Sequence, residues 1–429
     1  CEGPCGLQTI WNLQPSMDDK QMWLVRLMTD AKTGDRQELP RPPWRLQHWR
    51  QLLAYHANTP NTPTLALLLL AELLFCLLII WKVPYTEIDW RAYMEEVEGY
   101  LKGDTNYYNL KGGTGPLVYP AGFVYIYSLL YYVCDSGTNV QRGQYIFAVL
   151  YVINLALVFD LYSRSKKLPV WGFLLLCASR RVHSLFVLRL FNDPVAVLLF
   201  HASASLACRG KWRLSCLLFS MGVSVKMNIL LYAPGLLFLL WRASGESVVG
   251  TVGYLSICAG FQLLVGCHFL VTHPIAYMHR SFELGRVFMY KWSVNWQFVP
   301  EWVFVSKGFA LLLLGLHLAV LWLLFRRYWT RMSPAGRPLT PGVILWVLYS
   351  CQLPGIIFAR SLHYQFYSWY FYTVPYLLWC GPQPLSVRVG LLVCLEWVWN
   401  LYPPHMAVSL LMLATHIAIL ALCVLATDA

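Results

Sequence analysis

The sequence is poor in charged residues. Of its 429 residues only 13% are Asp, Glu, Lys or Arg, whereas 58% are hydrophobic. This excess is too large for one water-soluble core, and a mean hydropathy of +0.49 excludes a disordered chain. Because a membrane-spanning helix needs about 20 mostly apolar residues, the composition predicts an all-α polytopic membrane protein with about a dozen crossings.

Several signatures of metal and cofactor chemistry are also missing. The chain has no Cys-x-x-Cys pair, no spacing of Cys and His suited to zinc, no Gly-Lys phosphate loop and no internal repeat. Most of its 13 cysteines lie inside apolar stretches, where cysteine acts as a small hydrophobic residue. We therefore expect neither a metal nor a cofactor.

The organisation of the chain follows from its apolar windows. Residues 1–64 are mixed in charge and contain Arg41, Arg45 and Arg50, so we expect a cytosolic leader. We expect residues 65–426 to form a single transmembrane domain, which would also hold any catalytic site. Its first apolar run is near 65–83, and further windows lie near 116–133, 144–162, 169–188, 194–208, 214–241, 248–270, 308–325, 343–359, 366–380, 388–402 and 406–426.

The net charge of +12 is spread over the short loops between these windows, where it orients a chain in the bilayer and argues against nucleic acid as a partner. The basic run at 326–337 predicts a cytosolic loop. It places the loops near 271–307 and 360–365 on the opposite face, and six acids against three bases place the loop near 84–115 there as well.

The early topology has two solutions. If 116–133 and 144–162 both cross, the bases at 163–168 fall on the wrong face. If 116–133 instead dips in and returns, and 214–241 breaks near Lys226, then 163–168, 209–213 and 326–337 are all cytosolic. We prefer this second arrangement. Arg180 and Arg181 further indicate that the span at 169–188 ends early.

Two carboxylates follow the first apolar run, Glu87 and Asp89 in the segment TEIDW. A carboxylate in low-dielectric surroundings is a candidate general base, because burial raises its pKa toward the working range. Either acid could equally cap the helix that starts near Trp90. The next loop, GGTGPLVYP, offers glycines for close approach to a ligand and Tyr119 for contact, although an ordinary interfacial span entry explains Tyr119 as well.

Ionisable residues also interrupt the apolar windows. The segment RLFNDP contains Arg189, Asn192 and Asp193, which could face a cavity or could form an Arg189–Asp193 pair that satisfies a helix break. Lys226, in SVKMN, could bind an anionic head group or extend its ammonium to the interface.

Further bases occur among aromatic residues in the later loops. Arg280 and Arg286 lie in the 271–307 loop with Trp296, and Arg360 and His363 lie in RSLHYQFY. Arginines interleaved with aromatic rings suit a phosphate carried on a lipid or sugar. The alternative is that these bases form a solvated face, and that His363 is a structural histidine.

Taken together, an acid after the first span and a loop of bases and aromatics on the same face suggest group transfer from a lipid-borne phosphate. The runs TEIDW, TGPLVYPAGFVYI, RVHSLFVLRLFNDPVAV, SVKMN, APGLLFLL, VNW and SLHYQFY resemble the dolichyl-phosphate-mannose-dependent α-1,3-mannosyltransferases of asparagine-linked glycosylation. This resemblance extends from about residue 83 to about residue 402.

The resemblance implies a GT-C-type glycosyltransferase of the endoplasmic reticulum membrane that acts on the lumenal face. Its partners would be dolichyl phosphate mannose, the lipid-linked pentamannosyl chitobiose acceptor and membrane lipid, and its reaction would invert the anomeric centre without a metal. The position that matches the catalytic base is Asp89. A transferase with another sugar or acceptor, and a transporter or scramblase, remain alternatives.

The remaining candidates fall into two groups. We expect the leaving phosphate to be bound by Arg280, Arg286 and His363. Arg360 and Lys226 are second-ranked candidates for the same role. The acceptor or pocket residues would be Glu87, Trp90, Tyr119, Asn192, Asp193 and Trp296.

Overall fold

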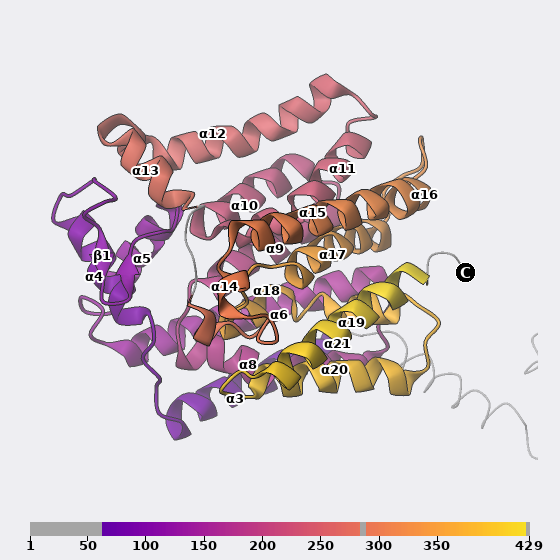
Figure 1. Ribbon diagram of the computed structural model, residues 1–429, viewed down its shortest axis with the longest axis horizontal. Coiled ribbons are helices and arrows are strands. Elements are labelled where there is room, and N and C mark those ends of the chain that lie inside the picture. The colour runs from indigo at the N-terminus through magenta and orange to yellow at the C-terminus, as the bar shows by residue number, and fades with distance from the viewer. Residues whose placement is uncertain (1–61, 284–288, 426–429) are drawn as a thin grey trace, which may run out of the picture. The chain divides into compact units, whose positions relative to one another are not determined.

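The computed structural model describes residues 62–283 and 289–425, which are mostly helical (Figure 1). Residues 1–61 of the expected leader and Arg286 lie outside the described residues, and the last three leader residues begin the first described helix. The first half contains α3 (Thr62–Lys82), α4 (Trp90–Leu101), α5 (Ala121–Val133), α6 (Val140–Ser165), η1 (Val170–Gly172), α7 (Phe173–Cys177), α8 (Arg180–His183), η2 (Ser184–Leu188), α9 (Asp193–Cys208), α10 (Trp212–Val225), η3 (Met227–Tyr232) and α11 (Ala233–Ala243).

The second half continues with α12 (Val248–Thr272), α13 (Pro274–Ser281), η4 (Tyr290–Trp292), α14 (Glu301–Phe304), α15 (Lys307–Leu324), η5 (Phe325–Trp329), α16 (Thr330–Met332), α17 (Pro341–Ile357), η6 (Tyr364–Phe366), α18 (Tyr367–Tyr370), α19 (Val374–Trp379), α20 (Leu385–Asn400) and α21 (Met406–Leu425). One small exception to the all-helical expectation is a hairpin of two-residue strands, β1 (Lys111–Gly112) and β2 (Gly115–Pro116), paired antiparallel.

Membrane-capable helices confirm a polytopic membrane protein. Within the described ranges, five helices are long and apolar enough to cross a bilayer, and a sixth crossing arises if the bent pair Val170–Cys177 and Arg180–Leu188 counts as one span. Other apolar windows form helices of 10–17 residues, shorter than a single span usually requires.

Both expected interruptions are present. Helix α10 ends at Val225, Lys226 is extended, and the chain resumes as η3 and α11. In the 169–188 window α7 ends at Cys177, and α8 starts at Arg180 with its axis turned by 50°. The Ser179 hydroxyl caps α8 by accepting from the Val182 N–H. A charged residue at each break thus coincides with a change of helix direction.

The core lies where the helices contact one another away from lipid. Helix α9 packs against α6 and α10, α10 against α12, and α3 against α6. Every side chain of α17 from Ile344 to Ile357 is buried, because this helix is surrounded by α6, α11, α15 and α21. By contrast, few residues of α3 and α12 are buried, as expected for apolar helices that face lipid.

Helix α3 is attached to this core through the side chain of Glu72. Glu72 is buried, and its Oε2 atom lies 2.8 Å from both the Tyr151 hydroxyl, which donates to it, and His183 Nε2. The other ring nitrogen of His183 lies 2.7 Å from the Ser179 carbonyl, so it must carry the proton that this oxygen accepts. A polar contact therefore ties the first span to α6 and α8.

The antiparallel helices α9 and α10 define two ends of the structure. Asp193 starts α9 and Lys226 follows α10, so both lie at what we call the Asp193 end. Arg209 follows α9, and its position defines the Arg209 end, about 24 Å away for a helix of 16 residues.

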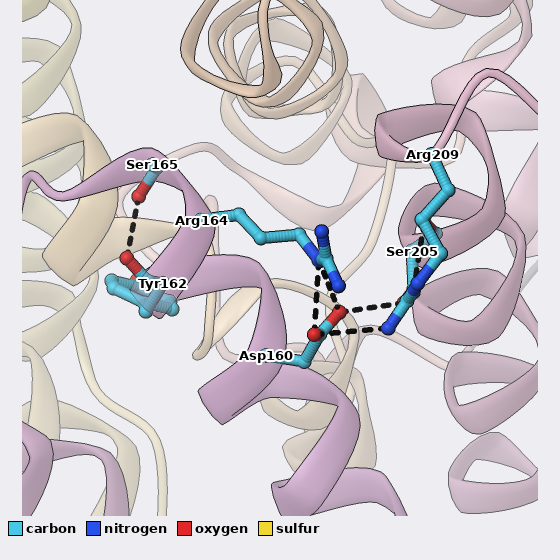
Figure 2. A network of polar contacts seen from close by, with 6 residues as sticks. All are labelled: Asp160, Tyr162, Arg164, Ser165, Ser205 and Arg209. Atoms are coloured by element: carbon cyan, nitrogen blue, oxygen red, sulfur yellow. Dashed lines mark hydrogen bonds and ion pairs between the residues drawn. The ribbon is translucent and has the colours of Figure 1, made fainter. Parts of the chain in front are cut away.

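The basic connectors gather at the Arg209 end. Arg164, from the end of α6, and Arg209 both bind the carboxylate of Asp160 (Figure 2). Helix α11 returns from the Lys226 break to this end, where Arg242 donates to the Ser333 hydroxyl. The connectors at 163–168, 209–213 and 326–337 therefore share one end, as the preferred topology predicts.

Candidate functional site

The site begins with the loop that joins α3 to α4. The Thr86 N–H donates to the Leu188 carbonyl at 3.0 Å, which ties this loop to the break before α9. Asp89 occupies the N-cap position of α4, but its side chain makes no cap hydrogen bond. Instead Glu87 Oε1 accepts from the Arg91 N–H at 3.0 Å. The capping alternative therefore applies to Glu87, and the Asp89 carboxylate is directed elsewhere.

The Asp89 carboxylate is partly buried and faces hydroxyl groups. The Tyr93 hydroxyl lies 3.3 Å from its Oδ2 atom, and Thr114 forms a further side-chain hydrogen bond with it. Burial raises the pKa of Asp89, while the charge of Lys226 and the hydroxyl contacts lower it, and Asp193 raises it further; the net direction is upward. Asp89 is thus a stronger base than an exposed aspartate.

A second group of polar side chains lies beside it, formed by Asn192, Asp193, Lys226 and Trp369, which we call the Asp193 cluster. Lys226 Nζ lies 2.7 Å from Asp193 Oδ2 and 2.9 Å from Asn192 Oδ1. Trp369 Nε1 donates to the other Asp193 oxygen. Asn192 and Asp193 are fully buried, so the ammonium and the carboxylate compensate each other inside the protein.

Tyr93 connects Asp89 to this cluster. Its hydroxyl lies 3.3 Å from Asp89 and 3.5 Å from Asn192 Oδ1, and its single proton can serve either acceptor. The Tyr119 ring joins at the same place, with its centroid 5.8 Å from that of Tyr93 and 5.4 Å from Lys226 Nζ. Asp89, Tyr119, Asn192, Asp193 and Lys226, all predicted site residues, therefore occupy one region.

Two of the alternatives left open for this region do not occur. Asp193 pairs with Lys226 rather than with Arg189, whose guanidinium donates to the Ser184 hydroxyl. Lys226 does not extend to the membrane interface, because its side chain is only 10% exposed. An extended residue at the Lys226 break can direct its ammonium inward, where the start of α9 supplies the counter-charge.

The glycine-rich loop has a structural explanation. A Cβ atom at Gly112 would collide with the backbone of Ala92 in α4, so the close approach is to the protein and not to a ligand. The neighbouring Gly113 N–H donates to Glu95 Oε2 at 2.7 Å. These contacts fix the hairpin against α4 and position Thr114 near Asp89.

The side chains of the two predicted tryptophans make structural contacts. Trp90 is 1% exposed, and its Nε1 atom donates to the Gly137 carbonyl at 2.9 Å, so it anchors α4 in the core. Trp296 belongs to a separate apolar cluster with Phe304 and Leu313, and its Nε1 atom donates to the Ala359 carbonyl at 2.7 Å.

The later loops supply bases at the same end. The 293–296 and 359–362 segments are joined by the Val294 N–H, which donates to the Leu362 carbonyl at 2.7 Å. His363 follows, and its ring centroid is 5.4 Å from that of Phe366, whose own centroid is 6.0 Å from Lys226 Nζ. His363 is therefore separated from the Asp193 cluster by a single ring.

Two further predicted phosphate ligands, Arg280 and Arg360, already have protein partners. Arg280 is paired with Glu283 at 2.7 Å, and its guanidinium lies 5.4 Å from the centroid of the Tyr108 ring. Arg360 donates to the Val305 carbonyl at 3.2 Å. Arg286 lies outside the described residues.

Sequence reasoning missed three features of the site. Tyr93, Phe366 and Trp369 read as ordinary aromatic residues, yet they connect Asp89, Lys226 and His363. The signal that could have identified Tyr93 is its position one helical turn after Asp89, since side chains four residues apart share a face. Of the two alternatives for Arg189, the pair with Asp193 is absent, and its guanidinium donates to the Ser184 hydroxyl instead.

Comparison with known proteins identifies the family of this chain. The profile of the family described as "ALG3 protein" matches residues 66–409. A protein of Arabidopsis thaliana is 45% identical, with 84% of this chain and 87% of that protein covered. A protein of Homo sapiens is 47% identical, with coverage of 83% and 85%, and one of Neurospora crassa is 43% identical, with coverage of 80% and 83%.

All three proteins are named Dol-P-Man:Man(5)GlcNAc(2)-PP-Dol alpha-1,3-mannosyltransferase. The matched region contains Asp89, the Asp193 cluster and His363, and it is far more extensive than a shared motif. The chain belongs to the ALG3 protein family.

Proposed function

We propose that this chain transfers mannose from dolichyl phosphate mannose to the lipid-linked acceptor Man5GlcNAc2-PP-dolichol and forms an α-1,3 linkage. The names of its relatives support the donor, the acceptor and the linkage. The observation that carries the residue assignment is the Asp89 carboxylate, which is partly buried, has a raised pKa and is not used to cap α4.

The proposed reaction is a single inverting displacement. Asp89 accepts the proton of the acceptor 3-hydroxyl, and the oxygen attacks the β-linked anomeric carbon of mannose. The bond from that carbon to the phosphate oxygen breaks, and dolichyl phosphate leaves with the bonding electrons. A base that is positioned and partly desolvated contributes about 10²- to 10⁴-fold to such a step.

The leaving phosphate needs a cation, and we assign Arg189 to this role alongside His363. Arg189 is half-buried, donates to Ser184 and forms no ion pair with any of the described residues. Its neighbour Leu188 bonds the Asp89 loop through the Thr86 N–H. Arg280 and Lys226, by contrast, are already paired with carboxylates. A guanidinium can offset phosphate charge through two parallel hydrogen bonds.

The proposed setting is the endoplasmic reticulum membrane, with about a dozen crossings counted over long, bent and short helices in a GT-C-type fold. The Asp193 end faces the lumen and carries the loops near 84–115, 271–307 and 360–365. The Arg209 end and residues 1–64 face the cytosol. The separation of Asp89 from the basic connectors supports this orientation, because Lys and Arg favour the cytosolic side.

A reconstituted transfer assay tests this function. Purified protein would be given dolichyl phosphate mannose or dolichyl phosphate glucose together with the Man5GlcNAc2 acceptor, and the linkage of the product would be determined. We expect mannose in α-1,3 linkage; transfer of glucose, another linkage or the absence of transfer would contradict the proposal.

The Asp89→Asn variant tests the base. We expect normal insertion and a loss of transfer of at least about 100-fold, since the amide cannot accept the proton. Glu98→Gln is a matched control, because Glu98 lies on α4 and pairs with Lys102 in solvent. Appreciable transfer by Asp89→Asn would refute the assignment.

A further inference from the structure

The Arg209 end contains an ordered group of charges that the proposed reaction does not use. Asp160, near the end of α6, accepts from Arg164 Nε at 2.9 and 3.1 Å, from Arg209 Nη2 at 3.0 Å and from the Ser205 hydroxyl at 2.8 Å (Figure 2). Arg209 Nη1 also donates to the Ser205 carbonyl at 3.0 Å. Two guanidiniums from different helices are thereby held side by side by one carboxylate.

This carboxylate orders the surrounding charge without neutralising it. Arg164 and Arg209 alone exceed its charge, and Lys166, Lys167, Lys211 and Arg213 on the same two connectors are exposed as well. We call these six cations the Asp160 basic cluster. Orientation in the bilayer explains why such loops are basic. Orientation alone does not require that one partly buried acid, Asp160, hold two of the arginines in a defined geometry.

Aromatic residues place this cluster at the level of lipid head groups. Trp171 is 44% exposed and follows Lys167 by four positions, and its ring centroid lies 6.0 Å from that of Trp379. Cys380 follows Trp379 in the chain, and Lys167 lies close enough to Cys380 to affect its thiol electrostatically. Tryptophans with one exposed face are characteristic of the boundary between hydrocarbon and head groups.

We propose that the Asp160 basic cluster is a binding site for the phosphate of an anionic phospholipid in the leaflet at the Arg209 end. The exposed edges of the two arginines supply paired N–H donors, and the lysines supply diffuse positive charge. Basic pockets between transmembrane helices suit such head groups, and each nearby lysine or arginine adds about 1 kcal/mol to the attraction.

Lipid retention by the purified full-length chain tests the site. The protein would be reconstituted in phosphatidylcholine nanodiscs with increasing phosphatidylinositol, and bound phospholipid would be measured by native mass spectrometry. The triple variant Lys166→Gln, Lys167→Gln, Lys211→Gln should bind phosphatidylinositol about 100-fold more weakly. The matched variant Arg326→Gln, Arg327→Gln, Arg337→Gln removes the same charge from the other exposed basic loop at this end and should retain the lipid.

A second variant separates an organised site from general electrostatic attraction. Asp160→Ala makes the cluster more positive and removes both oxygens that hold the two arginines. The proposed site predicts weaker phosphatidylinositol binding, whereas simple surface charge predicts binding that is equal or tighter. Equal lipid loss in the two triple variants, equal or tighter binding by Asp160→Ala, or preferential retention of dolichyl phosphate or inorganic phosphate would each overturn the proposal. Mannose transfer by each variant reports that the protein is folded.

Discussion

Replacing Lys226 with methionine should destabilise the protein by about 3 kcal/mol. Lys226 Nζ lies 2.7 Å from Asp193 Oδ2, and the two side chains are 10% and 0% exposed. Removing one partner of a buried ion pair costs about 3–5 kcal/mol, because the other charge stays desolvated without compensation. Asp193 would keep its hydrogen bond from Trp369, so we expect the lower part of this range.

Thermal unfolding of the purified protein measures this cost. Wild type, Lys226→Met, Asp193→Asn and the double variant would be heated at one scan rate, because membrane proteins often unfold irreversibly. The double variant buries no net charge and should be more stable than Lys226→Met. This non-additivity identifies the pair, since residues in contact couple in a double-mutant cycle.

An exposed ion pair provides the control. Lys102 pairs with Glu98 at 2.8 Å, but the lysine side chain is 72% exposed. Surface pairs contribute about 0–1 kcal/mol, so Lys102→Met should leave the unfolding midpoint nearly unchanged. If Lys226→Met were as stable as wild type and only weakened the use of donor, Lys226 would be a phosphate ligand and the buried-pair explanation would be refuted.

Three further predictions concern the site. Transfer requires ionised Asp89, so the rate should fall as the pH drops through the pKa of Asp89. Tyr93→Phe removes a hydrogen bond that lowers this pKa, so the acid limb of the pH–rate profile should move to higher pH. An acid limb that does not move would exclude the contact between Tyr93 and Asp89. Arg189→Met should raise the KM for dolichyl phosphate mannose about 10-fold or more, with little change in acceptor KM, whereas Arg142→Met, which removes an exposed pair at the same end, should alter neither. Gly112→Ala should lower stability by about 1–3 kcal/mol in thermal unfolding, because α4 leaves no room for a Cβ; an unchanged midpoint would show that the hairpin can shift.

Much of the organisation was predictable from local sequence. The apolar windows identified the helices, and the isolated charges at Arg180 and Lys226 correctly marked where two windows break. Charge in the connectors correctly grouped 163–168, 209–213 and 326–337 at one end. Each of these features depends on the energy of moving a short segment or a single charge into lipid, which hardly depends on the rest of the fold.

Pairing within the site was much less predictable. Lys226 bonds Asp193, 33 positions before it, and Asp193 bonds Trp369, 176 positions after it. The nearest carboxylate to Arg189 in the sequence is also Asp193, which made that pair one of the two alternatives for Arg189. Helix direction at the two breaks determines which cation reaches the carboxylate, and this direction depends on packing across α9, α10 and η3.

The assignment of roles to Glu87 and Asp89 shows the same division. The order of residues established that two acids follow the first span near the membrane surface, because hydropathy and charge act residue by residue along the chain. Which acid caps α4 and which faces Tyr93 depended on the path of the loop, fixed by the Thr86–Leu188 hydrogen bond to a segment about 100 residues away. Sequence thus specified the chemical groups and the membrane, whereas contacts between distant segments selected the carboxylate that remains available for chemistry.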